Sequence, residues 1–339
     1  MAVMALKMSD IAKMAQVSKS AVSIAINGKE GISDETRQKI LKIIAEQGYT
    51  PLRKSRKAEE DGIGEVTFLV VTTSGLVQGD YRSLPFFNSL ISALSADVSQ
   101  LNGSLRTVTV QGDELADRIE SVANSSDNGV LVLGTDLTQE QVLLIKQYVP
   151  NVVFLDTYFE DIIADFVTMD NYQGARLAGR YMLQQGYTDI GYFASDKLMS
   201  NFNERRRGFR VALAEADLRI AEEHFYYVSP GQSSSADFDL ADLGPKLPAA
   251  IFCEDDYIAI RLLKAAQRAG IRVPEELAIM GFDDIYEGTL VSPELSTIHV
   301  PVDQMAQQAL HQLQGQMHTT HWNPQKTLVA TILVKRRSL

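Results

Sequence analysis

The amino-acid sequence predicts an α/β protein in which a small all-α head precedes two subdomains of doubly wound parallel sheet. Three observations support this prediction. Short helical patterns with serine caps fill the first 50 residues, apolar strand-like runs alternate with amphipathic helical stretches from Glu65 onward, and 339 residues suffice for two or three domains. Hydrophobic residues make up 45% of the chain, enough to bury a large core.

The head contains three predicted helices, over Ser9–Met14, over Lys19–Ile26 and in a third segment that begins after Ser33. Apolar residues recur at helical spacing in each of them. Ser18 and Ser33 stand where N-caps belong, because a hydroxyl there accepts a hydrogen bond from a backbone N–H that has no partner within the helix. Gly48 is expected to end the third helix.

Helix, tight turn and helix in succession form the layout of a helix-turn-helix motif, whose second helix enters the major groove of DNA by its N-terminal end. The side chains exposed there would be Lys19, Ser20 and Ser23, which can bond to guanine edges or to phosphates. The alternative is a three-helix cap with no role in DNA binding, since short helices with serine caps are common.

The charge of the chain is unevenly distributed. The formal net charge is −11, which taken alone would argue against a nucleic-acid partner. Residues 1–57, however, hold 11 Lys or Arg against 5 Asp or Glu, whereas residues 58–339 hold 21 against 38. A basic head on an acidic body favours a small nucleic-acid-binding module joined to a domain with another task.

The body alternates between two kinds of segment. Apolar strand-like runs occupy 68–71, 130–133, 152–156, 189–195, 249–255 and 277–284. Amphipathic helical stretches occupy 85–100, 114–124, 171–185, 204–217, 258–269 and 302–317. Continuous apolar strands between helices predict parallel sheets that are covered on both faces.

Carboxylates follow three of the predicted strands. They are Asp156, the run Glu254, Asp255 and Asp256, and the pair Asp283 and Asp284. Ligands of doubly wound sheets bind beyond the carboxyl ends of the strands, and a carboxylate can accept from two hydroxyls, so these residues predict a sugar or polyol site. The alternative is a set of helix N-caps, and we expect one member of each Asp pair to be one.

The run from Lys7 to Pro51 resembles the DNA-binding head of the LacI/GalR (lactose-repressor) family of bacterial transcription regulators. The resemblance rests on DIAKMAQVSKSAVS, ISDETRQKI and GYTP. The body resembles the effector domain of this family, which shares the fold of periplasmic sugar-binding proteins. The matching landmarks are PFF at 85–87, FLD at 154–156, R-x-x-G-F at 205–209, EDD at 254–256, GFDD at 281–284 and SPELSTI at 292–298.

The resemblance implies roles for five residues of the head. Lys19 and Ser20 would read bases. Ser18, Ser23 and Asn27 would hold phosphates. It also implies a homodimer that binds a near-palindromic operator, with half-sites about one helical turn apart.

One position of the recognition helix departs from the family pattern. Many members have Arg directly after the Ser of this helix, whereas this chain has Ile24. Ile24 can contact a thymine methyl group but cannot donate the paired hydrogen bonds with which Arg reads guanine. We therefore expect an operator that differs from the commonest family pattern.

Residues 52–64 form the predicted linker between head and body. In the family this segment becomes a short helix on DNA and carries a Leu that wedges into the minor groove, but here Ala58 stands at that position and is too small to wedge. Arg53 and Lys54 belong to a basic run that can hold phosphates. A flexible, solvated linker and a DNA-ordered hinge remain alternatives, with Leu52 as a substitute wedge.

The resemblance implies an effector pocket with two aromatic residues from the first subdomain and four hydrogen-bonding residues, which are Phe86, Phe87, Asp156, Arg205, Asp255 and Asp283. The family usually has Asn-Asp where this chain has Asp255-Asp256. The change removes a donor and leaves an acceptor, so the effector would offer one more donor there. Arg206 and Arg207 are expected on a solvated helix face.

The expected organisation follows from these observations. Residues 1–51 form the helix-turn-helix domain. Because the family fold crosses between its subdomains three times, residues 65–165 and 293–325 would form the first subdomain and residues 166–292 and 326–339 the second. The last strand-like run, residues 328–336, would lie in the second subdomain.

The sequence contains no pattern typical of catalysis or of cofactor binding. Neither a phosphate-binding glycine loop nor a nucleophile elbow occurs, and His318 and His321 lack the neighbours of a metal site. We expect no cofactor, no membrane span, no signal peptide and a cytoplasmic protein.

The first hypothesis for the function is an effector-responsive regulator of transcription, expected to act as a repressor. A sugar-binding transport component and an enzyme with a DNA-binding head are the alternatives. A phosphocarrier protein as corepressor stays open, as does a sugar phosphate as effector.

Overall fold

The chain folds into two compact units, Met1–Gly62 and Ile63–Leu339, in a computed structural model. The structure describes residues 8–26, 31–46, 62–126, 128–197, 199–228, 240–244 and 246–339. Within these ranges, none of the helices combines the length and apolar character needed to cross a bilayer. Of the expected linker, residues 52–64, the part from 52 to 61 lies outside the described residues.

The smaller unit contains the three predicted helices. They are α1 (Met8–Ala15), α2 (Lys19–Ile26) and α3 (Asp34–Glu46). Ser18 Oγ accepts from the backbone N–H of Ala21 at 3.2 Å, and Ser33 Oγ accepts from that of Thr36 at 3.3 Å, so both serines are N-caps as predicted. The core between the helices consists of Ile11, Ala12, Ala15, Val22, Ala25 and Ile40.

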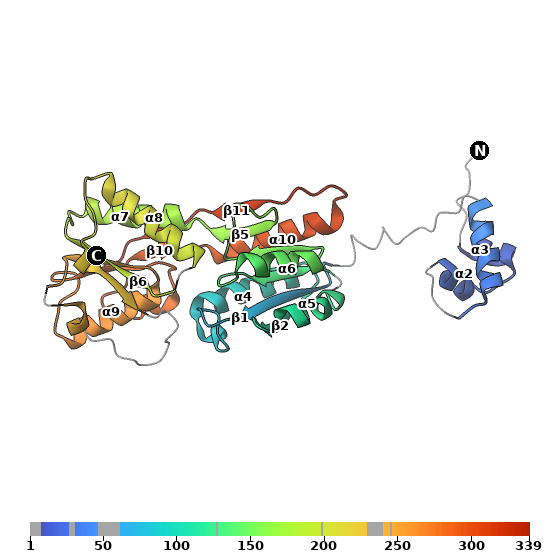
Figure 1. Ribbon diagram of the computed structural model, residues 1–339, viewed down its shortest axis with the longest axis horizontal. Helices are drawn as coiled ribbons and strands as arrows, with labels where there is room; N and C mark the ends of the chain where they lie inside the picture. Colours follow the sequence, from blue (N-terminus) through green and yellow to red (C-terminus); the bar gives the residue numbers. More distant parts are fainter. Residues whose placement is uncertain are drawn as a thin grey trace. The chain divides into compact units, whose positions relative to one another are not determined.

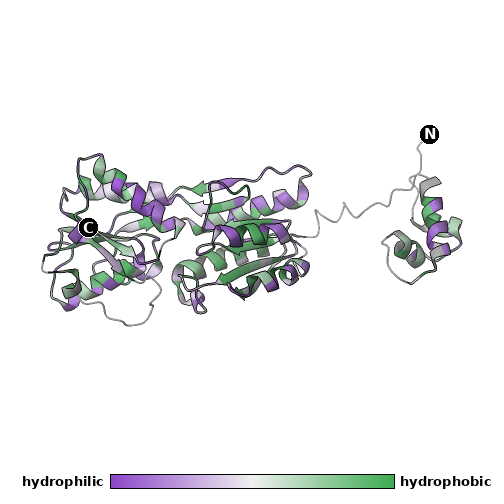
Figure 2. Ribbon diagram, viewed as in Figure 1, coloured by the Kyte–Doolittle hydropathy of each residue, from purple (hydrophilic) through white to green (hydrophobic). Residues whose placement is uncertain are grey.

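The first subdomain of the larger unit is built on a six-stranded parallel sheet in the order β11-β5-β4-β3-β1-β2. Its strands are β1 (Glu65–Thr72), β2 (Ser104–Gln111), β3 (Val130–Leu133), β4 (Val152–Leu155), β5 (Asp165–Met169) and β11 (Lys326–Val329). Alternate residues of β1 enter opposite cores, Phe68 on one face and Leu69 on the other. Both faces are therefore buried, and Figure 2 shows the sheet as a hydrophobic layer.

Helices cover both faces of this sheet, as its continuous apolar strands predict. On one face α4 (Pro85–Gln100) packs against α10 (Val302–His318), and on the other lie α5 (Leu115–Asn124) and α6 (Gln139–Tyr148) (Figure 1). The capping box of α6, in which Thr138 and Gln141 exchange bonds, fixes where this helix begins.

The second subdomain contains a four-stranded parallel sheet in the order β7-β6-β8-β9. Its strands and helices are α7 (Asn171–Gln184), β6 (Ile190–Ser195), α8 (Ser200–Ala214), β7 (Phe225–Val228), β8 (Ala250–Cys253), α9 (Asp256–Arg268) and β9 (Ala278–Met280). An antiparallel pair, β10 (Thr297–His299) and β12 (Ile332–Val334), is joined to the end of β9 by single bridges. Short 3₁₀ helices occupy Tyr81–Ser83, Glu222–His224, Leu240–Leu243 and Tyr286–Thr289.

The strand pairing corrects the expected subdomain boundaries. The chain crosses after β5, after β10 and after β11, so each crossing lies a few residues beyond the expected position. The placement of residues 326–339 in the second subdomain is wrong for β11, because this strand pairs with β5 in the first sheet. Likewise β10 pairs with β12 and not with the first sheet. In each case the misplaced segment is a short strand at an edge, whose partner is distant in sequence.

Candidate functional site

A small cavity lies between the two subdomains of the larger unit, with a volume of about 30 Å³. All six predicted effector residues line it, which are Phe86, Phe87, Asp156, Arg205, Asp255 and Asp283. They come from the start of α4, the end of β4, the middle of α8, the start of α9 and the loop after β9. The structure thus brings together residues that are spread over almost 200 positions, at the carboxyl ends of the strands.

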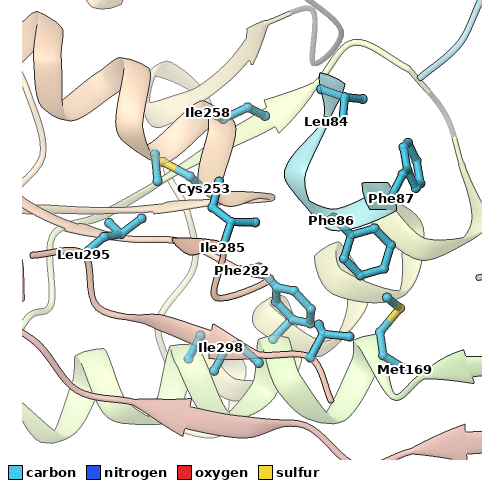
Figure 3. Close-up of a cluster of buried hydrophobic side chains, with 14 of the residues drawn as sticks. Leu84, Phe86, Phe87, Met169, Cys253, Ile258, Phe282, Ile285, Leu295 and Ile298 are labelled. Atoms are coloured by element: carbon cyan, nitrogen blue, oxygen red, sulfur yellow. The ribbon is translucent and has the colours of Figure 1, made fainter. Parts of the chain in front are cut away.

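The aromatic wall of the cavity is the first turn of α4. Pro85 is the first helical residue, which suits a ring that fixes φ and lacks an N–H. The rings of Phe86 and Phe87 meet edge to face, with centroids 5.6 Å apart. Figure 3 shows both within a buried cluster that also contains Phe282 and Met169. The N–H of Phe86 donates to Tyr257 Oη of α9 at 3.0 Å, a hydrogen bond between the subdomains.

Asp156 follows β4 in a left-handed conformation, with φ of 60°. Its Oδ2 accepts from Thr135 Oγ1 at 2.5 Å, and its Oδ1 accepts from Asn201 Nδ2 of α8 at 2.8 Å. Burial raises the pKa of Asp156 to about 6, although the bonds from Thr135 and Asn201 and the charge of Arg205 oppose this rise. Both carboxylate oxygens are therefore already engaged, one of them across the subdomain boundary.

The guanidinium of Arg205 is fixed by three hydrogen bonds. Nε donates to Asn171 Oδ1 at 2.8 Å and Nη1 to the carbonyl of Glu254 at 2.6 Å. Nη2 donates to Asp283 Oδ1 at 3.1 Å. The group also lies 3.7 Å from the centroid of the Phe282 ring. A planar fork held on several sides can orient a ligand without first losing its own rotational freedom.

Asp255 and Asp283 are the other two carboxylates of the cavity. Asp255 is the N-cap of α9, because its Oδ1 accepts from the N–H of Ile258 at 2.7 Å. Its Oδ2 is buried, and none of the residues that the structure describes bonds to it. Burial raises the pKa of each residue to about 7, and the charge of Asp283 adds to the rise at Asp255. Arg205 opposes the rise at Asp283. Asp283 also has a strained backbone, with φ of 116°.

The second members of the two Asp pairs support the fold. Asp256 is fully buried and accepts from Thr297 Oγ1 at 2.6 Å and from the N–H of Ile285 at 3.0 Å. Asp284 accepts from Arg336 Nη2 at 2.6 Å. The expectation of one cap in each pair is confirmed for Asp255, which also lines the cavity, and is wrong for the other pair.

Arg206 corrects another prediction. We expected a solvated side chain, but it is only 7% exposed and forms a two-pronged ion pair with buried Glu254, one prong 3.0 Å long. It also donates to the carbonyl of Ser195 at 2.7 Å. A guanidinium can be buried when an ion pair and hydrogen bonds of this kind compensate for its lost hydration. Arg207 is exposed as predicted and pairs with Glu204.

The sequence reasoning missed six cavity residues, which are Leu76, Thr135, Met199, Asn201, Phe202 and Tyr257. Two of them carried a usable signal. Asn201 lies four positions before Arg205, which places both on one face of a helix. Thr135 follows the apolar run 130–133, so it is a polar residue at a strand end like those that were noticed.

The structure describes only part of the predicted DNA-binding surface. Lys19 is exposed on the first turn of α2, and Ser18 caps that helix. Ile24 is half-buried, and the side chains of Ser20 and Ser23 are not described. Three further predicted residues lie outside the described residues, which are Asn27, Arg53 and Lys54.

Two family models match the chain. Residues 7–51 match the bacterial regulatory proteins of the lacI family, and residues 180–339 match a periplasmic binding protein-like domain. The chain is 29% identical to the ribose operon repressor of Haemophilus influenzae, with 98% of each chain covered. It is 28% identical to the transcriptional repressor PurR of Mannheimia succiniciproducens, with 90% of each covered.

Solved structures share the fold along nearly the whole chain. The Lac repressor bound to ONPG superposes with a TM-score of 0.71 at 18% identity, and the complex of the regulator CelR with cellobiose with 0.67 at 23% identity. Each comparison covers 98% of this chain and 99% of the other. At these identities the two structures establish the fold of this chain.

Head, body and pocket together define the class of effector-regulated transcriptional repressors. Residues 7–51 of the chain form a DNA-binding domain of the lacI type, a periplasmic-binding-protein-like domain follows, and the full-length relatives are repressors. The relatives named above are regulators of transcription and not enzymes or transport components. Among the described residues no group of three or more His, Cys, Asp or Glu side chains could hold a metal ion.

Proposed function

We propose that this chain is a homodimeric repressor that binds a near-palindromic operator in the cytoplasm and is switched by a sugar or sugar derivative. The observation that carries the proposal is the cavity between the subdomains, where two phenyl rings face three carboxylates and a fixed guanidinium. Aromatic rings pack on the C–H face of a sugar, and carboxylates and guanidinium bond to its hydroxyls. The relative named as a ribose operon repressor and the CelR–cellobiose complex support a carbohydrate effector.

The effector would act on the closure of the two subdomains. A cavity of about 30 Å³ has room for about one water molecule, so a sugar enters only when its walls separate. Hydrogen bonds between described residues join the walls across the boundary. They are Asn201 to Asp156, Phe86 to Tyr257 and Thr157 to Ser200. An effector that binds one arrangement more tightly than the other shifts the balance, and with it the fit of two heads on one operator.

Operator binding can be tested with the DNA upstream of the gene itself. Fluorescence anisotropy should show binding that weakens steeply with salt and that is lost when one half-site is scrambled. Lys19→Ala should weaken binding at least tenfold, whereas Lys39→Ala, an exposed lysine of α3, should change it little. Binding that ignores the half-sites, or equal effects of the two variants, would contradict the proposal.

The effector can be sought by thermal-shift screening of sugars and sugar phosphates, with and without operator DNA. A ligand that stabilises the free protein and lowers operator affinity is an inducer, and one that raises operator affinity is a corepressor. Asp283→Ala should abolish the shift. A phosphocarrier protein, added to the same anisotropy assay, tests for a protein corepressor, and sedimentation equilibrium tests for the dimer.

A further inference from the structure

The three cavity carboxylates differ in how their oxygens are used. Asp156 has one donor on each oxygen, from Thr135 and Asn201. Asp283 accepts from Arg205. Asp255 is different, because Oδ1 caps α9 while Oδ2 is buried and has no hydrogen-bond partner among the described residues. The residue is only 2% exposed and lines the cavity, so Asp255 offers a ligand a carboxylate oxygen to which no described residue bonds.

The described lining of the cavity includes a single cationic side chain, Arg205, against three carboxylates. Its Nε and both Nη atoms already donate to Asn171, to the Glu254 carbonyl and to Asp283. The neighbouring cation, Arg206, pairs with Glu254. The protein thus supplies fewer positive charges than negative ones around this cavity, and none of the hydrogen bonds of the described residues satisfies Asp255 Oδ2.

A buried carboxylate oxygen without a donor is unfavourable unless a partner arrives from outside the protein. A hydroxyl would give it a hydrogen bond but would leave the excess of negative charge. An ammonium group gives both a hydrogen bond and a compensating charge, and charge-assisted bonds are stronger than neutral ones. The aromatic wall of Phe86 and Phe87, meanwhile, suits the carbon skeleton of a sugar ring.

We propose that the effector is an amino sugar whose protonated amine donates to Asp255 Oδ2. This inference rests on the proposed sugar-binding function of the cavity and specifies the chemical class of its ligand. Asp255 then determines specificity, because it selects the amine over the hydroxyl that occupies the same ring position in a neutral sugar. Asp156 and Arg205 shape the cavity for either ligand.

Matched pairs of ligands test the proposal by isothermal titration calorimetry on the full-length protein near neutral pH. The pairs are D-glucosamine with D-glucose, D-galactosamine with D-galactose, and D-mannosamine with D-mannose. We expect at least one amino sugar to bind at least 30-fold more tightly than its neutral partner. Asp255→Asn should reduce this preference to threefold or less, while Asp161→Asn, the same change at an exposed loop residue, should leave it intact.

Asp255→Asn is suited to this test because asparagine is isosteric and still caps a helix, so the fold is retained. Weaker amine binding with unchanged or tighter binding of the neutral sugar in this variant supports the proposal. If the wild-type protein prefers the neutral member of its best pair, the proposal of an amino sugar is refuted, while the proposed function of a sugar-responsive repressor stands. No heat from any pair, with normal operator binding, overturns the amino sugar, and the wider thermal-shift screen then decides the proposed function separately.

Discussion

The two walls of the effector cavity are built from different chemistry. The wall from the first subdomain presents the rings of Phe86 and Phe87, and its one carboxylate, Asp156, has both oxygens engaged. The wall from the second subdomain presents a guanidinium and two carboxylates whose pKa values burial raises to about 7. The difference supports the proposal that the second wall discriminates between ligands, whereas the first supplies apolar contact and holds the closed arrangement.

Removing Arg205 should have the largest effect of any change in the cavity. Arg205→Ala leaves Asp283, Asn171 and the Glu254 carbonyl without their donor, and breaking a buried ion pair costs about 3–5 kcal/mol. We expect the free energy of unfolding in urea to fall by that amount and the effector-induced thermal shift to vanish.

The neighbouring Arg207 offers a matched control, because its side chain is 59% exposed. Arg207→Ala should change the free energy of unfolding by less than about 0.5 kcal/mol. Arg205→Lys keeps the charge but not the three-sided fork, so it should fold and still bind effector poorly. Normal effector binding by Arg205→Lys would mean that the second wall recognises charge alone.

Asp255→Asn should alter the pH dependence of stability. The pKa of Asp255 is raised in the folded protein, so between about pH 4 and pH 7 the folded state binds more protons than the unfolded state, and stability falls as the pH rises. The amide removes this loss. We expect the variant to be about 4 kcal/mol more stable than wild type at about pH 8 and equally stable near pH 4.

Urea unfolding at several pH values measures this difference. Asp161→Asn, at an exposed position, should follow the wild-type curve throughout. A stability difference for Asp255→Asn that is the same at every pH would show that the second wall does not store unfavourable charge, and the contrast between the walls would lose its electrostatic basis.

The sequence predicted much of the fold and of the cavity because those features depend on local pattern. Continuous apolar runs between helices gave the parallel sheets, and carboxylates after strands gave Asp156, Asp255 and Asp283. What failed depends on distant partners. Arg206 is buried only because Glu254 lies 48 positions away in sequence and beside it in space. Tyr257 bonds to Phe86, which lies 171 positions away in sequence, and β11 pairs with β5 over a similar sequence separation.

Phe86→Leu sharpens the contrast from the side of the first wall. The change keeps an apolar side chain but removes the ring face, which should cost about 1–1.5 kcal/mol of effector binding, roughly tenfold. Because the ring contacts carbon and not the discriminating group, the ratio of affinities within each ligand pair should stay unchanged. Phe159→Leu, at a half-buried ring packed against the opposite core of the same sheet, is the control. A changed ratio would assign discrimination to both walls.

Tyr257→Phe probes the contact between the walls. Helix α4 has no side-chain cap at Leu84, and Pro85 lacks an N–H. The Tyr257 hydroxyl of the other subdomain therefore accepts from the N–H of Phe86, which as a first-turn N–H has no partner within the helix. Opening the cavity transfers that N–H to water. The closed arrangement should therefore lose only about 0.5–1 kcal/mol without the hydroxyl, and effector affinity two- to fivefold.

The matched control for this smallest effect is Tyr226→Phe, because the buried Tyr226 hydroxyl has no hydrogen-bond partner within the described part of the chain. Calorimetry with the best ligand measures the affinity, and anisotropy measures operator release. If Tyr257→Phe weakens effector binding while Tyr226→Phe does not, closure contributes to affinity through this contact. Equal affinity in both variants would mean that the first wall meets the second through packing alone, and that the hydrogen bond only replaces one made by water in the open arrangement.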